Sequence, residues 1–418
     1  MLARQEKMTS ASSLSVETAA EPQLQARLAS IDIFRGLTMT LMIFVNQMAD
    51  VKGLPWWNYH MKASVDAMTY VDMVFPFFLF IVGLSMPIAI ESRLRGNPSM
   101  PALWRHVGMR TASLLVLGLI LANAGAGDSA RMGIGASLWA VVALTGAALW
   151  LNDYSPASFP PIVRRWLPVA GFAIVAVMLA IFRSIPAPGS SGWLDFSYPE
   201  ILGLIGWSYL GVALVYIPLR KWNWAPLALF LAMMSLCVLT AGDWVTFTDE
   251  LPFIAWPWGN GSMAGIMLAG IITSMIFTGS HRWPSLRQRM LLALIFAIAA
   301  IGAAWALTPL GVSKIRETPT WTLYSIGAAV LAFTALYWVC DVRGRTGWAS
   351  FARPAGSNTL TTYLLPDYAH FLLAAAGIRY LDTHLDSHWP GVLKCAIFTA
   401  LVLAAGSALT RSKIRLRL

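Results

Sequence analysis

Residues 30–50 read S-I-D-I-F-R-G-L-T-M-T-L-M-I-F-V-N-Q-M-A-D, and residues 71–90 read V-D-M-V-F-P-F-F-L-F-I-V-G-L-S-M-P-I-A-I. Each stretch is mostly apolar over about the 20 residues that a helix needs to cross the hydrocarbon core of a bilayer. Lipid offers no partners to backbone polar groups, so a spanning segment must be a helix or part of a closed barrel. Long, continuous apolar runs favour helices. The two stretches therefore predict two membrane-spanning helices joined by a short aromatic loop.

The composition of the whole chain agrees with this interpretation. Of its 418 residues, 57% are hydrophobic and 12% are charged, and the mean hydropathy is +0.62. These values are far from those of a water-soluble domain. We expect an all-α polytopic membrane bundle of about 10–12 transmembrane helices. The apolar runs predict spans at residues 31–50, 69–91, 105–123, 133–151, 166–183, 200–219, 223–241, 262–279, 289–308, 319–340, 357–378 and 391–410.

The chain divides into two parts. Residues 1–29 are polar, rich in Ser, Glu, Gln and Ala, and lack the apolar core of a signal peptide, so we expect a disordered cytoplasmic tail. Residues 30–418 are expected to form one transmembrane domain. The three cysteines have no metal-ligand spacing and are interpreted as buried apolar residues.

The net charge of +10 indicates topology. Most of the 30 Lys and Arg residues fall in alternate loops, beginning with the N-terminal tail. Short cytoplasmic loops carry such an excess of cations. Both termini are therefore expected in the cytoplasm, and the loop after the first span is expected on the outer side.

Three polar residues are then expected at the outer membrane surface: Asn46 near the end of the first helix, His60 in the loop, and Asp72 early in the second helix. A histidine side chain, with an ordinary pKa of about 6.5, can take a proton from a hydroxyl or amine near neutral pH. A side-chain amide can donate to a developing oxyanion, and a carboxylate can orient a histidine or meet an amine. The alternatives are a solvated loop histidine, a polar residue near a helix end, and an acid favoured by the helix dipole.

Arginines near the inner face suggest a second site. Asp32 and Arg35 lie three residues apart, which favours a structural ion pair and leaves contact with an anionic cofactor as an alternative. Arg93, Arg95, Arg105 and Arg110 could meet the phosphates of a cytosolic nucleotide-bearing cofactor, or could only follow the charge bias of inner loops.

Two later stretches carry further candidates. Lys314 and Arg316 lie in an outer segment where they could hold an anionic substrate, with a solvated loop as the alternative. Tyr363, Asp367 and His370 share one helical face, and Asp367 is expected near the middle of the membrane. An acid at that depth suggests a cavity lining or a proton path; the alternative is a hydrogen bond to His370 or to another helix.

Several common motifs are missing. The sequence holds no P-loop, no G-x-S-x-G, no H-E-x-x-H and no Cys/His metal pattern, and we see no internal repeat. We therefore expect no metal cofactor and no nucleic-acid partner.

The stretch R-L-A-S-I-D-I-F-R-G-L-T-M-T-L-M-I-F-V-N, then His60, then V-D-M-V-F-P-F-F-L-F-I-V-G resembles the heparan-α-glucosaminide N-acetyltransferase family. The stretches P-E-I-L-G-L-I-G-W-S-Y-L, S-K-I-R-E-T-P-T-W and G-S-N-T-L-T-T-Y are similar to its bacterial branch. The resemblance implies a transferase that takes an acetyl group from cytosolic acetyl-CoA and delivers it to a hydroxyl or amine of a sugar across the membrane. It also implies that Asn46 and His60 are active-site residues.

Together these observations assign roles to residues. Asn46 would polarise the carbonyl, His60 would act as general base, and Asp72 would complete the catalytic group; direct transfer and a transient acyl-histidine both remain open. The expected acetyl-CoA-binding residues are Arg35, Arg93, Arg105, Arg110 and Asn358, and the expected acceptor-binding residues are Lys314, Arg316, Tyr363 and Asp367.

The resemblance has limits. The loop Q-M-A-D-V-K-G-L-P-W-W-N-Y differs from the glycine-rich loop of the animal enzyme, and that enzyme's large lumenal N-terminal domain has no counterpart here. A bacterial envelope glycan, or an oligosaccharide on its way to degradation, is the expected acceptor in place of heparan sulfate. We expect a bacterial inner-membrane protein whose His60 loop faces the periplasm, and a homo-oligomer is compatible with the sequence.

A proton-coupled transporter of a small sugar or metabolite is the alternative function. Many helices with an acid in mid-membrane suit such a carrier, but the sequence has no repeat and no matched pair of broken helices. A structural partner of envelope enzymes is a third possibility, which predicts no activity.

Overall fold

The computed structural model describes residues 28–96, 99–155, 159–186, 192–198, 200–247, 257–278, 285–378 and 384–416. Most of the predicted disordered tail, residues 1–27, lies outside the described residues.

The described residues form helices and no strands. A helix lies over each of the predicted spans, so the all-α prediction is confirmed. The long helices are α2 (Ala29–Met48), α3 (Val74–Gly96), α4 (Met100–Ala124), α6 (Ala136–Leu151), α7 (Pro161–Ile181), α8 (Glu200–Leu219), α9 (Ala225–Ala241), α11 (Ser262–Thr278), α12 (Leu286–Ala306), α13 (Pro319–Tyr337), α15 (Thr359–Ala375) and α17 (His388–Arg411). The short elements are α5 (Ser129–Met132), α14 (Arg353–Ser357), η1 (Trp56–Asn58), η2 (Val71–Met73), η4 (Thr308–Leu310), η5 (Trp338–Val342) and η6 (Gly347–Ala349).

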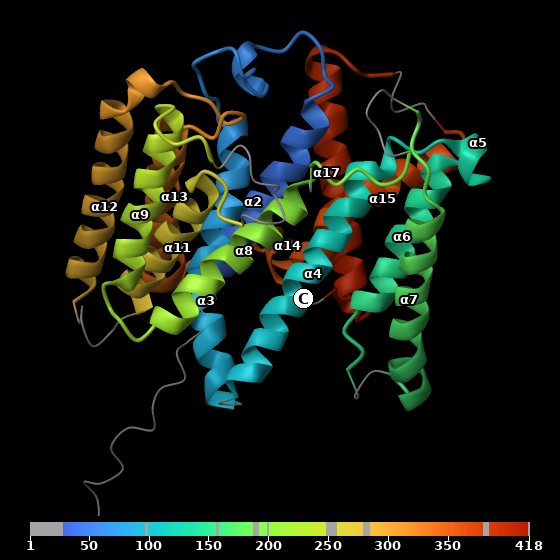
Figure 1. The fold of residues 1–418 in the computed structure, drawn as a ribbon, viewed down its shortest axis with the longest axis horizontal. Coiled ribbons are helices and arrows are strands. Elements are labelled where there is room, and N and C mark those ends of the chain that lie inside the picture. Colours follow the sequence, from blue (N-terminus) through green and yellow to red (C-terminus); the bar gives the residue numbers. More distant parts are fainter. Residues whose placement is uncertain are drawn as a thin grey trace, which may run out of the picture.

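Eight helices within the described ranges are long and apolar enough to cross a membrane: α2, α3 with η2, α4, α7, α8, α12, α13 with η5, and α17. Apolar helices of 16 or 17 residues, α6, α9 and α11, stand among them. In Figure 1 the α2–α3 loop lies at the top, while the end of α3 and the start of α4 lie at the bottom. The chain is therefore a multi-pass membrane protein with two well-separated faces.

Helix α2 lies inside the bundle, in contact with α3, α13, α14, α15 and α17. Its apolar window is 56% buried, whereas that of α7 is 11% buried and those of α12 and α17 are 22% buried. The exposed faces of these three helices are apolar, as lipid-facing surfaces are. The first predicted span is thus a core element, and residues on it can reach both faces of the protein.

Close helix contacts explain two glycines of the opening stretches. A Cβ placed on Gly36 would lie 2.1 Å from the backbone oxygen of Ala352, just before α14. A Cβ on Gly83 would lie 1.8 Å from the backbone oxygen of Met267 on α11. Small residues allow backbones to approach this closely, so α2 packs on α14 and α3 packs on α11.

Candidate active site

Tyr59 fixes the course of the loop between α2 and α3 on either side of His60. Its hydroxyl donates a hydrogen bond to the backbone oxygen of Val51 (2.6 Å) and accepts one from the backbone nitrogen of Leu54 (3.0 Å). The hydroxyl of Thr69 donates to the backbone oxygen of Tyr59 (3.0 Å). Both ends of the loop are therefore tied to the residue that precedes His60.

His60 and Asp72 form the core of a polar group at the α2–α3 end of the bundle, called the His60 group here. The Nδ1 atom of His60 lies 2.7 Å from Oδ1 of Asp72. The Asp72 side chain is 1% exposed, while that of His60 is 40% exposed. The second oxygen of Asp72 accepts a hydrogen bond from the backbone nitrogen of Thr69 (3.0 Å), and the indole of Trp321 donates to the backbone oxygen of Asp72 (3.1 Å). The buried Asp72 carboxylate is thus fixed by several hydrogen bonds, while the His60 ring that it contacts is accessible from outside the protein.

The contact with Asp72 determines which nitrogen of the His60 ring can accept a proton from another molecule. A carboxylate only accepts hydrogen bonds, so Nδ1 must carry the proton that it donates to Asp72. In the neutral ring Nε2 is then the nitrogen that lacks a proton, and among the described residues no hydrogen bond is made to it. Such a histidine can take a proton from an incoming molecule.

Lys314 is the third member of the group. Its Nζ atom lies 3.4 Å from Nδ1 of His60. Burial lowers the pKa of Lys314, and the nearby Asp72 carboxylate opposes that shift. Lys314 therefore brings a partly desolvated ammonium group to the edge of the histidine ring.

An ion pair holds the segment that carries Lys314 against the His60 loop. Arg316 donates to Asp66 Oδ1, which also accepts from the backbone nitrogen of Val312 (3.2 Å). This hydrogen bond from Arg316 holds the pKa of the Asp66 carboxyl below its usual range. Gly311 turns the chain at a φ of 82°, in the left-handed region that suits glycine. Arg316 thus contacts Asp66 in the His60 loop, whereas Lys314 contacts the histidine itself.

Glu317, which follows directly, provides a pH prediction. Burial raises the pKa of its carboxyl from the ordinary 4.5 to about 7. In this pH interval the folded state binds more protons than the unfolded state, so stability falls as pH rises from 4.5 to about 7. We expect Glu317→Gln to raise the unfolding midpoint by about 2–4 °C at pH 8 and to leave it unchanged at pH 4. Thermal unfolding at the two pH values, with the exposed Glu91→Gln as control, checks this; equal shifts at both would contradict it.

Asn46 lies in the last turn of α2, at the same end of the protein as the His60 loop. Its side chain is exposed, and within the described residues it makes no hydrogen bond to His60, Asp72 or Lys314. Its neighbour Gln47 is engaged differently: Oε1 of Gln47 lies 3.1 Å from Nε2 of His370. The structure thus brings together three of the outer candidates and leaves the Asn46 amide open to solvent.

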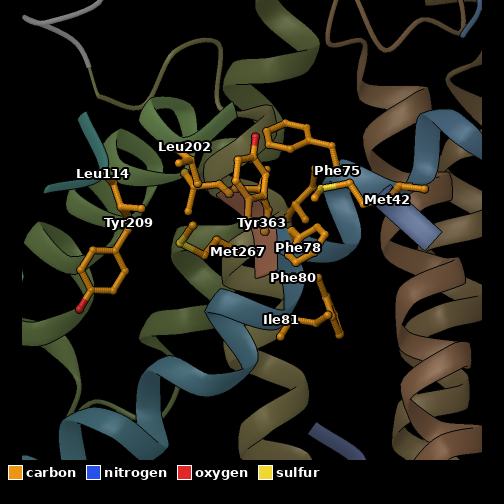
Figure 2. Packing of buried hydrophobic residues seen from close by; sticks show 14 of the residues in the cluster. Met42, Phe75, Phe78, Phe80, Ile81, Leu114, Leu202, Tyr209, Met267 and Tyr363 are labelled. Atoms are coloured by element: carbon orange, nitrogen blue, oxygen red, sulfur yellow. The ribbon is translucent and has the colours of Figure 1, made fainter. Parts of the chain in front are cut away.

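Tyr363 belongs to a separate polar group, and Asp367 lies one turn further along α15. The hydroxyl of Tyr363 donates to Oε1 of Glu200 (3.0 Å), whose other oxygen accepts from the backbone nitrogen of Leu202 (2.9 Å). Figure 2 shows Tyr363 within the apolar cluster that includes Phe75, Phe78 and Leu202. Sequence reasoning missed Glu200, although an acid at the start of a predicted span was a signal.

A cavity of about 380 Å³ opens toward the other end of α3. Arg35, Arg93, His106 and Arg110 line it together with Tyr209. Arg93 lies 21 residues after Asp72, which corresponds to about 30 Å along a helix. The arginine end of the cavity therefore lies about the thickness of the hydrocarbon core from the His60 group. The cavity lining extends along α3 from Arg93 back to Phe78, which is about 9 Å along the helix from Asp72.

Two arginines are built into this cavity. The Nη2 atom of Arg35 donates to the Ser85 hydroxyl (2.8 Å), and Nη1 lies 3.3 Å from the backbone oxygen of Gly356 and 3.5 Å from Asp32. The guanidinium of Arg110 lies 4.7 Å from the centre of the Tyr209 ring, and its buried Nε has no hydrogen-bond partner among the described residues. Arg110 thus brings a guanidinium group to the cavity, and one of its buried donors makes no hydrogen bond within the described residues.

The other two predicted cofactor residues lie outside the cavity lining. Arg105 is exposed on α4. Asn358 is 2% exposed, and its Nδ2 donates to Oγ1 of Thr410 and to the backbone oxygen of Ile414, both at 3.0 Å. Three of the five predicted residues thus share one cavity.

Residues 27–126 match the family model described as heparan-alpha-glucosaminide N-acetyltransferase, catalytic. The heparan-alpha-glucosaminide N-acetyltransferase of Homo sapiens is 37% identical over 100 residues, which are 24% of this chain and 14% of the relative. That of Mus musculus is 36% identical over 97 residues, which are 23% of this chain and 14% of the relative. The resemblance is confirmed over this segment, which carries α2, the His60 loop, α3 and α4.

Proposed function

We propose that this protein is a membrane acetyltransferase that moves an acetyl group from acetyl-CoA, held at the inner cavity, to a hydroxyl or amine of a sugar at the His60 loop. The observation that carries the proposal is the histidine held by a buried carboxylate, inside the segment that matches a catalytic family model. The arginine-lined cavity at the opposite end supports an anionic donor.

The outer group suits acyl transfer. As the acceptor oxygen or nitrogen attacks the thioester carbonyl, Nε2 of His60 takes the acceptor proton, and Asp72 stabilises the imidazolium that forms. The bond between carbonyl carbon and sulfur then breaks, and the proton passes from His60 to the leaving thiolate. The exposed Asn46 amide and the Lys314 ammonium are donors for the charge that develops on the carbonyl oxygen.

The inner cavity suits the phosphate end of acetyl-CoA. Arg35, Arg93 and Arg110 supply positive charge, and Arg110 has a buried donor that finds no acceptor in the described part of the chain. Guanidinium groups bind phosphate well. Arg35 and Asn46 lie eleven residues apart on α2, or about 16 Å along the helix. Acetyl-CoA carries its phosphates at one end and its thioester at the end of a long flexible arm, so it can bridge the distance between these two residues.

The topology and the acceptor are part of the proposal. The charge bias of the loops supports a cytoplasmic position for the inner cavity and for both termini, and hence a periplasmic His60 loop in a bacterial inner membrane. A bacterial envelope glycan or an oligosaccharide under degradation is the proposed acceptor, bound near Lys314.

Replacing Arg110 with Gln is expected to raise the KM for acetyl-CoA at least about tenfold, with a smaller change in kcat. The reason is that a hydrogen bond to a charged group contributes about 1.5–3 kcal/mol. Steady-state kinetics in detergent, varying acetyl-CoA, checks this. The matched control is Arg287→Gln, which removes an exposed arginine at the start of α12. If Arg110→Gln keeps the wild-type KM for acetyl-CoA, as Arg287→Gln is expected to do, the proposed donor site is wrong.

The proposed function is tested by measuring free CoA thiol released by the purified protein from acetyl-CoA, with glucosamine or N-acetylglucosamine as acceptor probe. Thiol release that depends on the acceptor and on His60 supports the transferase. Proteoliposomes that take up the labelled sugar without releasing thiol would instead identify the alternative, a carrier.

A further inference from the structure

The segment after α17 folds back onto the inner face of the bundle. Lys413 adopts a φ of 63°, and the backbone nitrogen of Ile414 donates to the backbone oxygen of Leu409 (2.9 Å), which reverses the chain. Residues 412–416, called the return segment here, then run past the ends of α6 and α15. Their course is set by hydrogen bonds.

Asn358 and Thr361 hold the return segment on one side. The Nδ2 atom of Asn358 donates to the backbone oxygen of Ile414 (3.0 Å), and the backbone nitrogen of Leu416 donates to the hydroxyl of Thr361 (3.2 Å). The same hydroxyl donates to Oδ1 of Asn358 (2.6 Å). The two side chains thus form one connected clamp.

The end of α6 holds the return segment on the other side. The backbone nitrogen of Arg415 donates to Oδ1 of Asn152 (2.9 Å), and the backbone nitrogen of Asp153 donates to the backbone oxygen of Arg415 (2.8 Å). A segment tied on both sides is a fixed part of the inner face.

The clamped segment reaches the arginine-lined cavity. Leu416 is 8% exposed and lines the cavity with Arg35, Arg93 and Arg110. Ser357 and Thr359 also line it, while Asn358 between them points to the return segment. Asn358 can therefore affect a bound molecule only through the residues that it holds.

We infer that the return segment forms one wall of the donor site and that Asn358 is a positioning residue that keeps this wall in place. The inference rests on the proposed function, because it takes acetyl-CoA as the occupant of the cavity. It also gives the predicted link between Asn358 and the cofactor a mechanism other than direct contact.

The test is titration of the full-length protein with acetyl-CoA, comparing wild type, Asn358→Ala, Leu416→Ala and the double variant. Each single change is expected to raise Kd about tenfold. The double variant is expected to bind no more weakly than the weaker single variant, because both changes remove the same wall; such non-additivity marks residues that act together. In a trypsin digest, cleavage at the exposed Lys413 and Arg415 should be faster in Asn358→Ala, and acetyl-CoA should slow it in the wild type.

Asn123→Ala is the matched control. Asn123 is 1% exposed, and its amide makes a comparable clamp on the backbone nitrogen and oxygen of Asp195, far from the cavity. It should lose thermal stability without a change in Kd. If Asn358→Ala and Leu416→Ala also keep the wild-type Kd, the inference is overturned while the proposed function stands. If the wild type itself shows no saturable binding, both are overturned. Should Asn358→Ala fail to fold, Leu416→Ala alone decides.

Discussion

Replacing His60 with Ala is expected to lower kcat for acetyl transfer by about 10²–10⁴-fold, the usual contribution of a positioned general base. The affinity for acetyl-CoA should stay near the wild-type value, because Arg93, at the arginine end of the cavity, lies about 30 Å from Asp72 along α3. Thiol release under saturating acetyl-CoA measures the first quantity, and ligand titration measures the second.

The control for this change is His384→Ala, which removes an exposed histidine in the segment before α17. It should leave kcat unchanged. A His60→Ala protein that transfers acetyl groups at the wild-type rate would remove His60 from the chemistry.

Replacing Asp72 with Asn is the second large effect that we expect, with kcat lower by roughly 10²–10⁴-fold. The amide can donate to Nδ1 of His60, which would place the ring proton on Nε2 and leave no free base. Kinetics of the single variants and of His60→Ala with Asp72→Asn measures the coupling. The double variant should be no slower than His60→Ala, because residues that act as a unit are not additive.

Independent, multiplying losses in that double variant would show that Asp72 does not act through His60. Because Asp72 is buried, unfolding midpoints of the same samples are needed to separate lost function from lost structure.

The membrane spans could be predicted from the sequence because a spanning helix has a simple requirement. Each span needs a long apolar run, and such runs are visible without knowledge of tertiary contacts. The approach of His60 to Asp72 followed from the same reasoning, since a loop and the start of the next helix lie at one membrane face. The sequence offered a hydrogen bond between Asp72 and His60 as one of several possibilities. Choosing among them required the Tyr59 and Thr69 contacts that shape the loop.

Contacts between distant segments could not be predicted from one sequence. Lys314 lies 254 residues from His60, and they meet because Arg316 and Asp66 join the two outer segments. Which arginines line the cavity could not be predicted from the sequence either. Arg105 and Arg110 are five residues apart and so point in different directions from α4, and only Arg110 lines the cavity. Which face of α4 packs inward depends on α8, its main neighbour.

In the proposed mechanism the chain binds acetyl-CoA at the arginine-lined cavity and uses His60 for the chemistry at the other end of the bundle. Thermal unfolding of the detergent-purified wild type and of His60→Ala, measured across acetyl-CoA concentrations, tests it most directly. A ligand that binds only the native state raises its stability by mass action, so a saturable increase of similar size in both proteins is predicted. The absence of any shift at millimolar acetyl-CoA would contradict the account.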